Sequence, residues 1–244
     1  MAGKVTDFIS EATGKSHRVD PVLPATGGPA GNAGITAWTG LFLLVLILVE
    51  VVTLLDVRGL ISWHIVVGTL LVPFALLKTA TTMWRVGRYY SGYQPYRSAG
   101  PPPTLLRILG PLVVITTLAE LGSGLALIAL GPTASRQVLF TALGQRIDTL
   151  TLHQALFFPF AAATGLHILG RTVPAIVQVS GRRQRDRSSR HTVPGGSWRT
   201  AALFVTLVAA AVTAALILSA SSGWKHDRAS HPDRRPAPAA PNHS

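Results

Sequence analysis

The stretch ISWHIVVGTLLVPFALLK, residues 61–78, is an apolar run with a histidine near its start and a lysine at its end. The apolar run continues to about Trp84, so it exceeds the roughly 20 residues that a helix needs to cross a bilayer. The fourteen residues from His64 to Lys78 turn a helix to within about 40° of four full turns and advance it by about 21 Å. His64 and Lys78 are therefore predicted to share one face of a membrane helix at two depths.

The rest of the chain has the same apolar character. Of its 244 residues, 48% are hydrophobic and only 13% are charged, which is unlike a soluble globular domain. The sequence predicts an all-α polytopic membrane helix bundle of five transmembrane helices, with a four-helix core. The expected spans cover about residues 35–55, 61–84, 105–130, 150–173 and 200–219.

Between and beyond these spans the composition changes, which predicts the domain organisation. Residues 1–34 and 221–244 are rich in Gly, Pro, Ala or charge, and we expect a disordered cytoplasmic tail and a disordered outer tail there. The segment RYYSGYQPYRSAGPPP, residues 88–103, is expected to be a short irregular loop. The predicted units are a four-helix membrane domain over 35–179, a basic cytoplasmic loop over 180–197 and the fifth helix over 198–220.

Basic residues predict the orientation in the membrane. With a cytoplasmic N-terminus, fourteen Lys and Arg residues flank the spans on the inside and seven on the outside, and Lys78 lies within the membrane. The positive-inside rule then favours a multi-pass protein of the plasma (cell inner) membrane with its N-terminus in the cytoplasm. The net charge of +12 is mostly this topology signal. The basic run GRRQRDRSSR, residues 181–190, is expected to lie near anionic lipid, and no nucleic-acid partner is predicted.

The chain has no cysteine. Disulfides, iron–sulfur clusters, thiolate-bound zinc and covalent c-type haem attachment all need sulfur, so they are excluded. Any metal must be held by nitrogen or oxygen atoms.

The fourth span repeats the spacing of the second. In TLHQALFFPFAAATGLHILG, residues 151–170, His153 is followed by His167 after the same fourteen residues. Because the second and fourth spans run in the same direction, we expect His64 to meet His153 near the outer surface and Lys78 to meet His167 near the inner one. Histidine nitrogens in a bundle core are suitable axial ligands for haem iron.

The doubled spacing of His64, His153 and His167 resembles the membrane cytochrome b family, over about residues 35–175. The resemblance implies one or two b-type haems between two helices, with these histidines as iron ligands, and a quinone as a further cofactor. The phrases HIVVGTLLVPFALLK and RYYSGYQPYRSAGPPPTLLRILGPLVV also resemble small actinobacterial membrane cytochrome-like proteins associated with molybdopterin oxidoreductases. That likeness implies an extracytoplasmic molybdopterin oxidoreductase as partner.

Lys78 departs from the di-haem pattern, which has histidine at this position. It is either an unusual axial ligand, a counter-charge for a buried carboxylate or haem propionate, or a side chain that snorkels to the inner interface. Two intramembrane carboxylates, Glu50 and Glu120, are expected in the outer half of the first and third spans. They either relay protons at a quinol site or pair structurally, one of them with Arg58.

These features predict an integral membrane b-type cytochrome that transfers electrons between the quinone pool and an extracytoplasmic redox partner. The chain would act as an electron-transfer subunit of an oxidoreductase, anchored by its contact with membrane lipid. The alternative is a non-redox membrane anchor or transporter subunit in which the histidines are structural.

Overall fold

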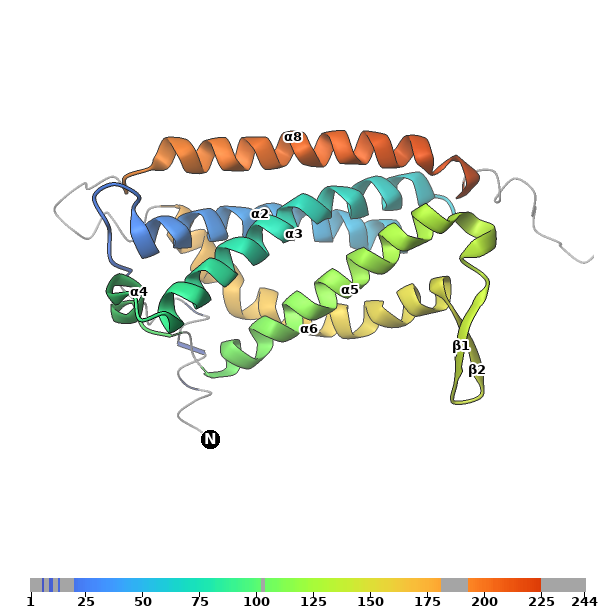
Figure 1. The fold of residues 1–244 in the computed structure, drawn as a ribbon, viewed down its shortest axis with the longest axis horizontal. Helices are drawn as coiled ribbons and strands as arrows, with labels where there is room; N and C mark the ends of the chain where they lie inside the picture. Colours follow the sequence, from blue (N-terminus) through green and yellow to red (C-terminus); the bar gives the residue numbers. More distant parts are fainter. Residues whose placement is uncertain are drawn as a thin grey trace, which may run out of the picture.

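Five long helices make up most of the computed structural model, which describes residues 20–101, 104–180 and 193–224, together with Thr6, 9–10 and Thr13. The helices are α2 (Gly28–Leu54), α3 (Ile61–Tyr90), α5 (Thr104–Ala134), α6 (Thr149–Val179) and α8 (Gly196–Ala220) (Figure 1). All five are long and apolar enough to cross a membrane. The predicted all-α, multi-pass fold is confirmed, and each predicted span coincides with one of these helices, the first of them extending one residue beyond the end of α2.

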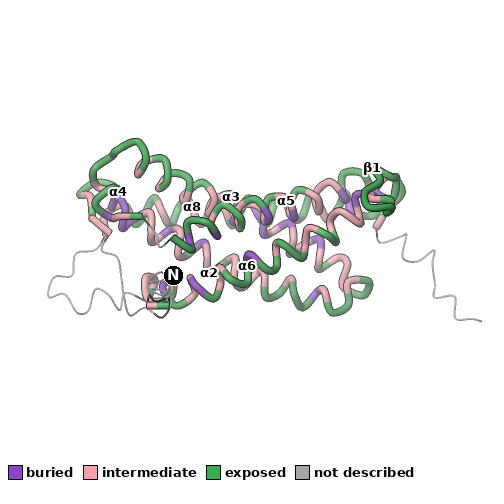
Figure 2. The backbone as a smooth tube through the Cα atoms, turned by 90° about the horizontal axis from the view of Figure 1, so that it is seen from below, coloured by how far each residue is buried: buried purple, intermediate pink, exposed green. Residues whose placement is uncertain are grey.

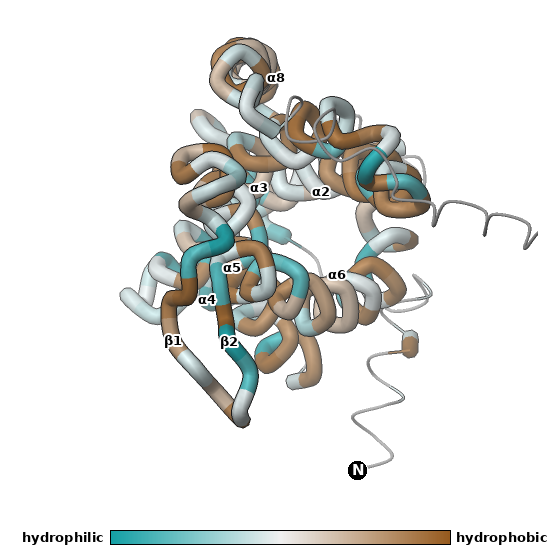
Figure 3. Tube along the Cα trace, turned by 90° about the vertical axis from the view of Figure 1, so that its right-hand side faces the viewer, coloured by the Kyte–Doolittle hydropathy of each residue, from teal (hydrophilic) through white to brown (hydrophobic). Residues whose placement is uncertain are grey.

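Helices α2, α3, α5 and α6 form a closed four-helix ring. Helix α2 packs against α3 and α6, and α5 packs against the same two helices. Helix α8 lies outside this ring, where it packs mainly against α3 (Figures 1 and 3). The fifth helix is thus a cover on the bundle and leaves the interior of the ring to the other four.

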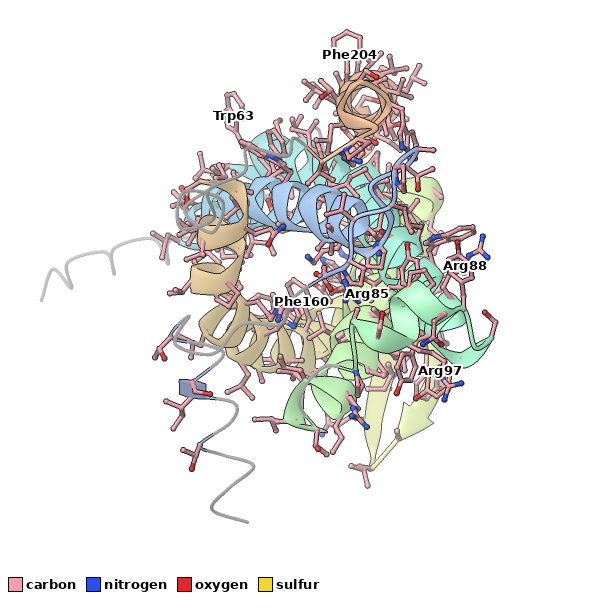
Figure 4. All side chains as sticks on the ribbon, turned by 90° about the vertical axis from the view of Figure 1, so that its left-hand side faces the viewer. Trp63, Arg85, Arg88, Arg97, Phe160 and Phe204 are labelled. Atoms are coloured by element: carbon pink, nitrogen blue, oxygen red, sulfur yellow. The ribbon has the colours of Figure 1, made fainter. Side chains whose placement is uncertain are left out.

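The outer surface of the bundle is apolar, and few residues are buried (Figure 2). Large apolar side chains such as Trp63 on α3 and Phe204 on α8 point away from the bundle and are 63% and 64% exposed (Figure 4). In water such a surface would be strongly unfavourable, because extended exposed apolar patches drive association. Contact with membrane lipid satisfies these side chains, in agreement with the membrane location.

The start of α2 corrects the prediction of a disordered tail up to residue 34. The helix begins at Gly28, because Gly27 caps it in the left-handed conformation (φ 73°) and Pro29 occupies its first turn. Proline suits the first turn, where its missing N–H costs no hydrogen bond. Arg199 of α8 donates hydrogen bonds to the carbonyl oxygens of Thr26 and Val193 beside this cap. The start of α2 is therefore fixed to the start of α8.

Two connections contain regular structure that the sequence did not predict. The segment expected to be an irregular loop holds the end of α3 and the short helix α4 (Gln94–Ser98). Between α5 and α6 the chain forms an antiparallel hairpin of β1 (Val138–Ala142) and β2 (Gln145–Asp148), with Leu143 and Gly144 in its turn. The hairpin extends from one end of the bundle (Figures 1 and 3).

Four proline residues within the spans do not interrupt the helices. Helices α3, α5 and α6 continue through Pro73, Pro111, Pro159 and Pro174. The one non-helical residue within α5 is Gly131, with φ 73° and ψ 171°, directly before Pro132. Neighbouring helices can satisfy the backbone groups that a membrane proline leaves unpaired, so this continuity is compatible with the bilayer.

The hairpin ends at a helix cap, and we expect Asp148→Ala to destabilise the start of α6. The Asp148 carboxylate accepts a hydrogen bond from the Thr151 backbone N–H at 2.7 Å, which holds the pKa of this carboxyl below its usual range. Loss of such a cap costs about 1 kcal/mol. Thermal unfolding in detergent should show a lower midpoint for Asp148→Ala, and Asp148→Asn should retain most of the stability.

The direction of the pKa shift also sets the pH dependence of this cap. The pKa of Asp148 is lower in the folded state than in the unfolded state. The stabilisation of the fold by the ionised Asp148 cap is therefore complete above the unfolded-state pKa of about 4, and it is lost as the pH falls through the folded-state pKa. The difference in midpoint between wild type and Asp148→Ala should therefore disappear at low pH. A difference that stays constant down to acid pH would contradict this origin.

Candidate functional site

Two histidines from different helices meet at one end of the four-helix ring. His64 lies in the first turn of α3 and His153 lies in the second turn of α6. Their ring centroids are 6.3 Å apart and the ring planes are inclined by 67°. The prediction that His64 and His153 face each other at the same depth is confirmed. Helices α3 and α6 therefore start on the same side of the bundle.

The ring of His64 is held by two residues of α2. Its Nδ1 atom lies 2.8 Å from the carboxylate oxygen Oε1 of Glu50 and 3.2 Å from the hydroxyl oxygen of Thr53. Thr53 in turn donates its hydroxyl hydrogen to the Glu50 carbonyl. These contacts fix the orientation of the imidazole and leave its Nε2 atom as the nitrogen able to bind a ligand.

The ring of His153 is held in the same manner by α5. Its Nδ1 atom lies 2.9 Å from the Ser123 hydroxyl oxygen and 3.5 Å from Oε1 of Glu120. Glu50 and Glu120 each have their second carboxylate oxygen buried without a hydrogen-bond partner among the described residues. Among the described residues, the ion-pair partners of Glu50 and Glu120 are the ring nitrogens of His64 and His153, and neither carboxylate pairs with Arg58.

A cavity of about 580 Å³ adjoins this histidine pair. Both histidines and both carboxylates line it, and the remaining wall is mostly leucine, isoleucine, valine and phenylalanine. Ligand pockets in proteins are typically about 300–1,000 Å³ and mainly apolar, with a few well-placed polar groups. The cavity therefore has the size and the lining of a cofactor or ligand site.

Two glycines leave room beside the polar groups of this cavity. A Cβ atom at Gly124 would lie 3.3 Å from Cε1 of the His153 ring, and one at Gly68 would lie 3.4 Å from Oε1 of Glu50. By contrast, a Cβ at Gly122 would meet no atom within 4 Å. Gly124 is thus a position where the absence of a side chain permits the observed position of the histidine ring.

We expect Gly124→Val to displace the His153 ring and to lower ligand occupancy of the cavity severalfold, whereas Gly122→Val should have little effect. The reason is that a valine side chain at position 124 would occupy the space of the His153 imidazole, whereas position 122 faces open space. The measurement is the amount of bound cofactor per chain after purification, with the folded fraction checked by size-exclusion chromatography. Equal cofactor content in the two variants would contradict this role of Gly124.

The inner depth holds the second predicted pair. The Lys78 ammonium donates a hydrogen bond to the Thr36 carbonyl of α2 at 3.2 Å, and Lys78 lies near enough to His167 to interact with it electrostatically. Nδ1 of His167 is buried without a hydrogen-bond partner within the described ranges. The nearby cavity is about 110 Å³ and is lined by Lys78 but not by His167. Lys78 and His167 are thus near each other, and their role as iron ligands stays a prediction.

Arginines at the end of α3 have partners within the protein. Arg85 forms an ion pair with Asp20, and the Arg88 guanidinium lies 4.4 Å from the Trp84 ring centroid and 5.0 Å from that of Tyr93. Figure 4 shows Arg85, Arg88 and Arg97 at the same end of the bundle as α4. Arg85 and Arg88 therefore have partners at the end of the bundle that do not depend on a cofactor.

Three residues of the site were missed by the sequence-based prediction. Thr53 and Ser123 provide the hydroxyl groups beside the histidine nitrogens. Trp224 lines the large cavity and donates its indole N–H to the Leu127 carbonyl at 3.2 Å, although its segment was expected to be a disordered tail. A tryptophan directly after a membrane span was the signal for it, because tryptophan is enriched at membrane interfaces.

Comparisons of the chain with protein-family models, curated proteins and solved structures found no match. Within the described ranges, no group of three or more His, Asp or Glu side chains could hold a metal ion. The chemistry of the site must therefore be argued from the two imidazoles, the two carboxylates and the cavity that they line.

Proposed function

We propose that the chain is an integral membrane b-type cytochrome that holds one haem b between His64 and His153. The observation that carries this proposal is the 6.3 Å separation of the two imidazole rings, each anchored through its Nδ1 atom at the wall of a large apolar cavity. A haem brings its own four equatorial nitrogens, so two protein ligands are enough. The lack of a three-residue metal cluster is compatible with this ligand set.

The ring separation fits two imidazoles on opposite sides of one metal ion. A metal–imidazole nitrogen bond of about 2 Å and a distance of about 1 Å from nitrogen to ring centre, counted on both sides, give roughly 6 Å. The observed 6.3 Å agrees with this sum. An ordinary edge-to-face contact of two rings covers the same separation, so the proposal depends also on the large cavity that both histidines line.

The carboxylates of Glu50 and Glu120 contact the Nδ1 atoms of the two histidines, as acceptor groups usually do beside metal-binding histidines. A ligating histidine commonly donates its second ring N–H to a carboxylate or another acceptor, which fixes the tautomer and raises the basicity of the ligand. Glu50 is placed for this role on His64, and Glu120 together with Ser123 on His153. When bound, the haem would supply one-electron redox chemistry, while the chain contributes ligands, orientation and an apolar surrounding.

The membrane location supports a role in electron transfer with the quinone pool. An apolar five-helix bundle is in contact with the phase in which quinones dissolve, and a redox centre at one end is placed to exchange electrons with a partner outside the membrane. We further propose that the protein lies in the plasma membrane with its N-terminus in the cytoplasm, and that its extracytoplasmic redox partner is a molybdopterin oxidoreductase. Proton relay by Glu50 and Glu120 stays a prediction.

The experiment that tests the proposal is a dithionite-reduced minus oxidised spectrum of the detergent-purified protein, produced with ample haem supply. We expect b-type bands and, by pyridine-haemochrome quantification, about one haem per chain. About two haems would point to a second site that involves His167 and Lys78. Folded protein without any haem would overturn the proposal in favour of a non-redox anchor or transporter subunit.

A further inference from the structure

We infer that the β1–β2 hairpin lies flat in the membrane interface, with its apolar side chains among phospholipid molecules. The hairpin connects α5 to α6, and His153 lies in the second turn of α6. The hairpin is therefore at the same end of the bundle as the histidine pair. Its contact with lipid is independent of whether that pair binds a haem.

The length of α5 places the hairpin at the level of the lipid head groups. The 31 residues of this helix extend over roughly 46 Å, and a bilayer with its head groups is about 40–45 Å thick. Figure 1 shows the hairpin directed across the helices and to the side of the bundle, and Figure 3 shows its tip beyond them. The hairpin thus runs along the membrane surface, where its neighbours are lipid molecules, and does not extend outward into water.

The first strand of the hairpin is apolar and exposed. Val138, Leu139 and Phe140 follow one another in β1, and all three side chains are exposed. In water, a cluster of this kind would promote association with other molecules. The helices beside the hairpin already present apolar side chains to lipid. The exposed face of β1 therefore continues the lipid-facing surface of the bundle.

The turn of the hairpin carries an apolar residue where a polar one is usual. Leu143 and Gly144 form the two-residue turn, with φ values of 50° and 74°. Turns with positive φ at both central residues prefer Asn or Asp before Gly, because a bulky side chain is strained in this conformation. The Leu143 side chain is nevertheless fully exposed at the tip. Lipid around the tip accounts for leucine at this position.

The pairing of the strands gives the hairpin one apolar and one polar face near its tip. Phe140 lies opposite Ile147, and Thr141 lies opposite Arg146. Paired residues in an antiparallel ladder share a face, and successive residues alternate between faces. Phe140 and Ile147 therefore face one side, and Thr141 and Arg146 face the other. An element with this division of side chains is suited to the boundary between acyl chains and head groups.

The charges of the hairpin also match phospholipid. Arg136 and Arg146 are exposed cations, whereas the Asp148 carboxylate accepts the hydrogen bond that caps α6. Arginine forms charge-assisted hydrogen bonds with phosphate groups. Lipid phosphate thus suits the arginines, as the acyl chains suit the apolar face.

Spin labels test this position, because the chain has no cysteine and an introduced cysteine is a unique labelling site. Phe140→Cys, Leu143→Cys and the matched control Thr141→Cys are labelled in the full chain and placed in vesicles of phosphatidylcholine and phosphatidylglycerol in equal parts. Power-saturation electron paramagnetic resonance measures collisions of each label with oxygen, which dissolves in lipid, and with a water-soluble nickel complex. We expect the labels at positions 140 and 143 to collide mainly with oxygen, and the label at 141 to collide with nickel severalfold more often than they do.

Two outcomes would overturn the inference. Frequent nickel collisions at all three positions would mean that the hairpin stands in water. Rare collisions with both reagents at positions 140 and 143 would mean that a second protein chain covers the apolar face.

The role of the tip is tested in the background of the labelled Phe140→Cys variant. Leu143→Asn suits the positive φ and removes the apolar side chain, so it should raise nickel collisions at position 140 severalfold. Leu143→Met stays apolar and should leave them unchanged. Unchanged collisions in Leu143→Asn as well would contradict anchoring by the tip. Because none of these measurements uses haem, they separate the lipid contact of the hairpin from the proposed electron-transfer function.

Discussion

Replacement of either His64 or His153 by alanine is expected to abolish haem binding and with it the Soret and α bands of the purified protein. Each imidazole is one of two protein ligands at the proposed site, and the rings are 6.3 Å apart. Alanine would remove one of the two residues that would hold the haem, and it would leave a carboxylate without its partner in an apolar cavity. The measurement is the reduced minus oxidised spectrum, with haem quantified per chain.

The matched control for this prediction is His167→Ala. His167 lies on the same helix as His153, but it does not line the large cavity. We expect the His167 variant to keep the wild-type haem content. Equal loss of haem in all three variants would contradict the assignment of the outer pair, provided that each variant elutes as a folded species from size-exclusion chromatography.

Glu50→Gln is expected to raise the midpoint potential of the bound haem by about 60 mV. A carboxylate that accepts a hydrogen bond from Nδ1 of His64 increases electron donation by the imidazole, which favours the oxidised iron. The neutral amide removes the charge-assisted part of that bond. A tenfold change in the equilibrium between oxidised and reduced iron corresponds to about 59 mV for one electron. Spectroelectrochemical titration of wild type and variant measures the difference.

The two carboxylates should differ in their effect on the potential. Oε1 of Glu120 lies 3.5 Å from Nδ1 of His153, against 2.8 Å for the Glu50–His64 pair, and the Ser123 hydroxyl is closer. Glu120→Gln should therefore raise the potential less than Glu50→Gln, at unchanged haem content. A shift of the same size for both variants, or no shift for Glu50→Gln, would show that the carboxylate does not act through its histidine.

The fold was largely predictable because hydrophobic length dominates in a membrane. Runs such as 35–55 and 105–130 have little alternative to a spanning helix, since unpaired backbone groups are excluded from the bilayer core. The errors lie where backbone geometry matters more than composition. Gly27 and Pro29 were counted as features of disorder, yet they form the start of α2. The β1–β2 hairpin was missed because its strands are largely exposed and carry no clear alternation.

The histidine pair was predictable, but its surroundings were not. Equal spacing from a common membrane side puts His64 and His153 at the same depth, and the ring contact confirms this. That Glu50 belongs to His64 and Glu120 to His153 depends on which helices are neighbours in the ring. The spacing of residues along one helix also does not show which neighbouring helix a side chain contacts. The hydrogen bond from Lys78 to the Thr36 carbonyl of α2 could therefore be found only from the positions of the helices.

Trp224 has a consequence for how the protein is made. The segment directly after α8 supplies this tryptophan to the wall of the large cavity, where its indole N–H donates a hydrogen bond to the Leu127 carbonyl of α5. Both proposed axial histidines leave the ribosome well before α8 does. The wall of the cavity is thus complete only when the last helix has entered the bilayer. We expect chains shortened before α8 to insert into the membrane and to lose cofactor more readily than the full chain.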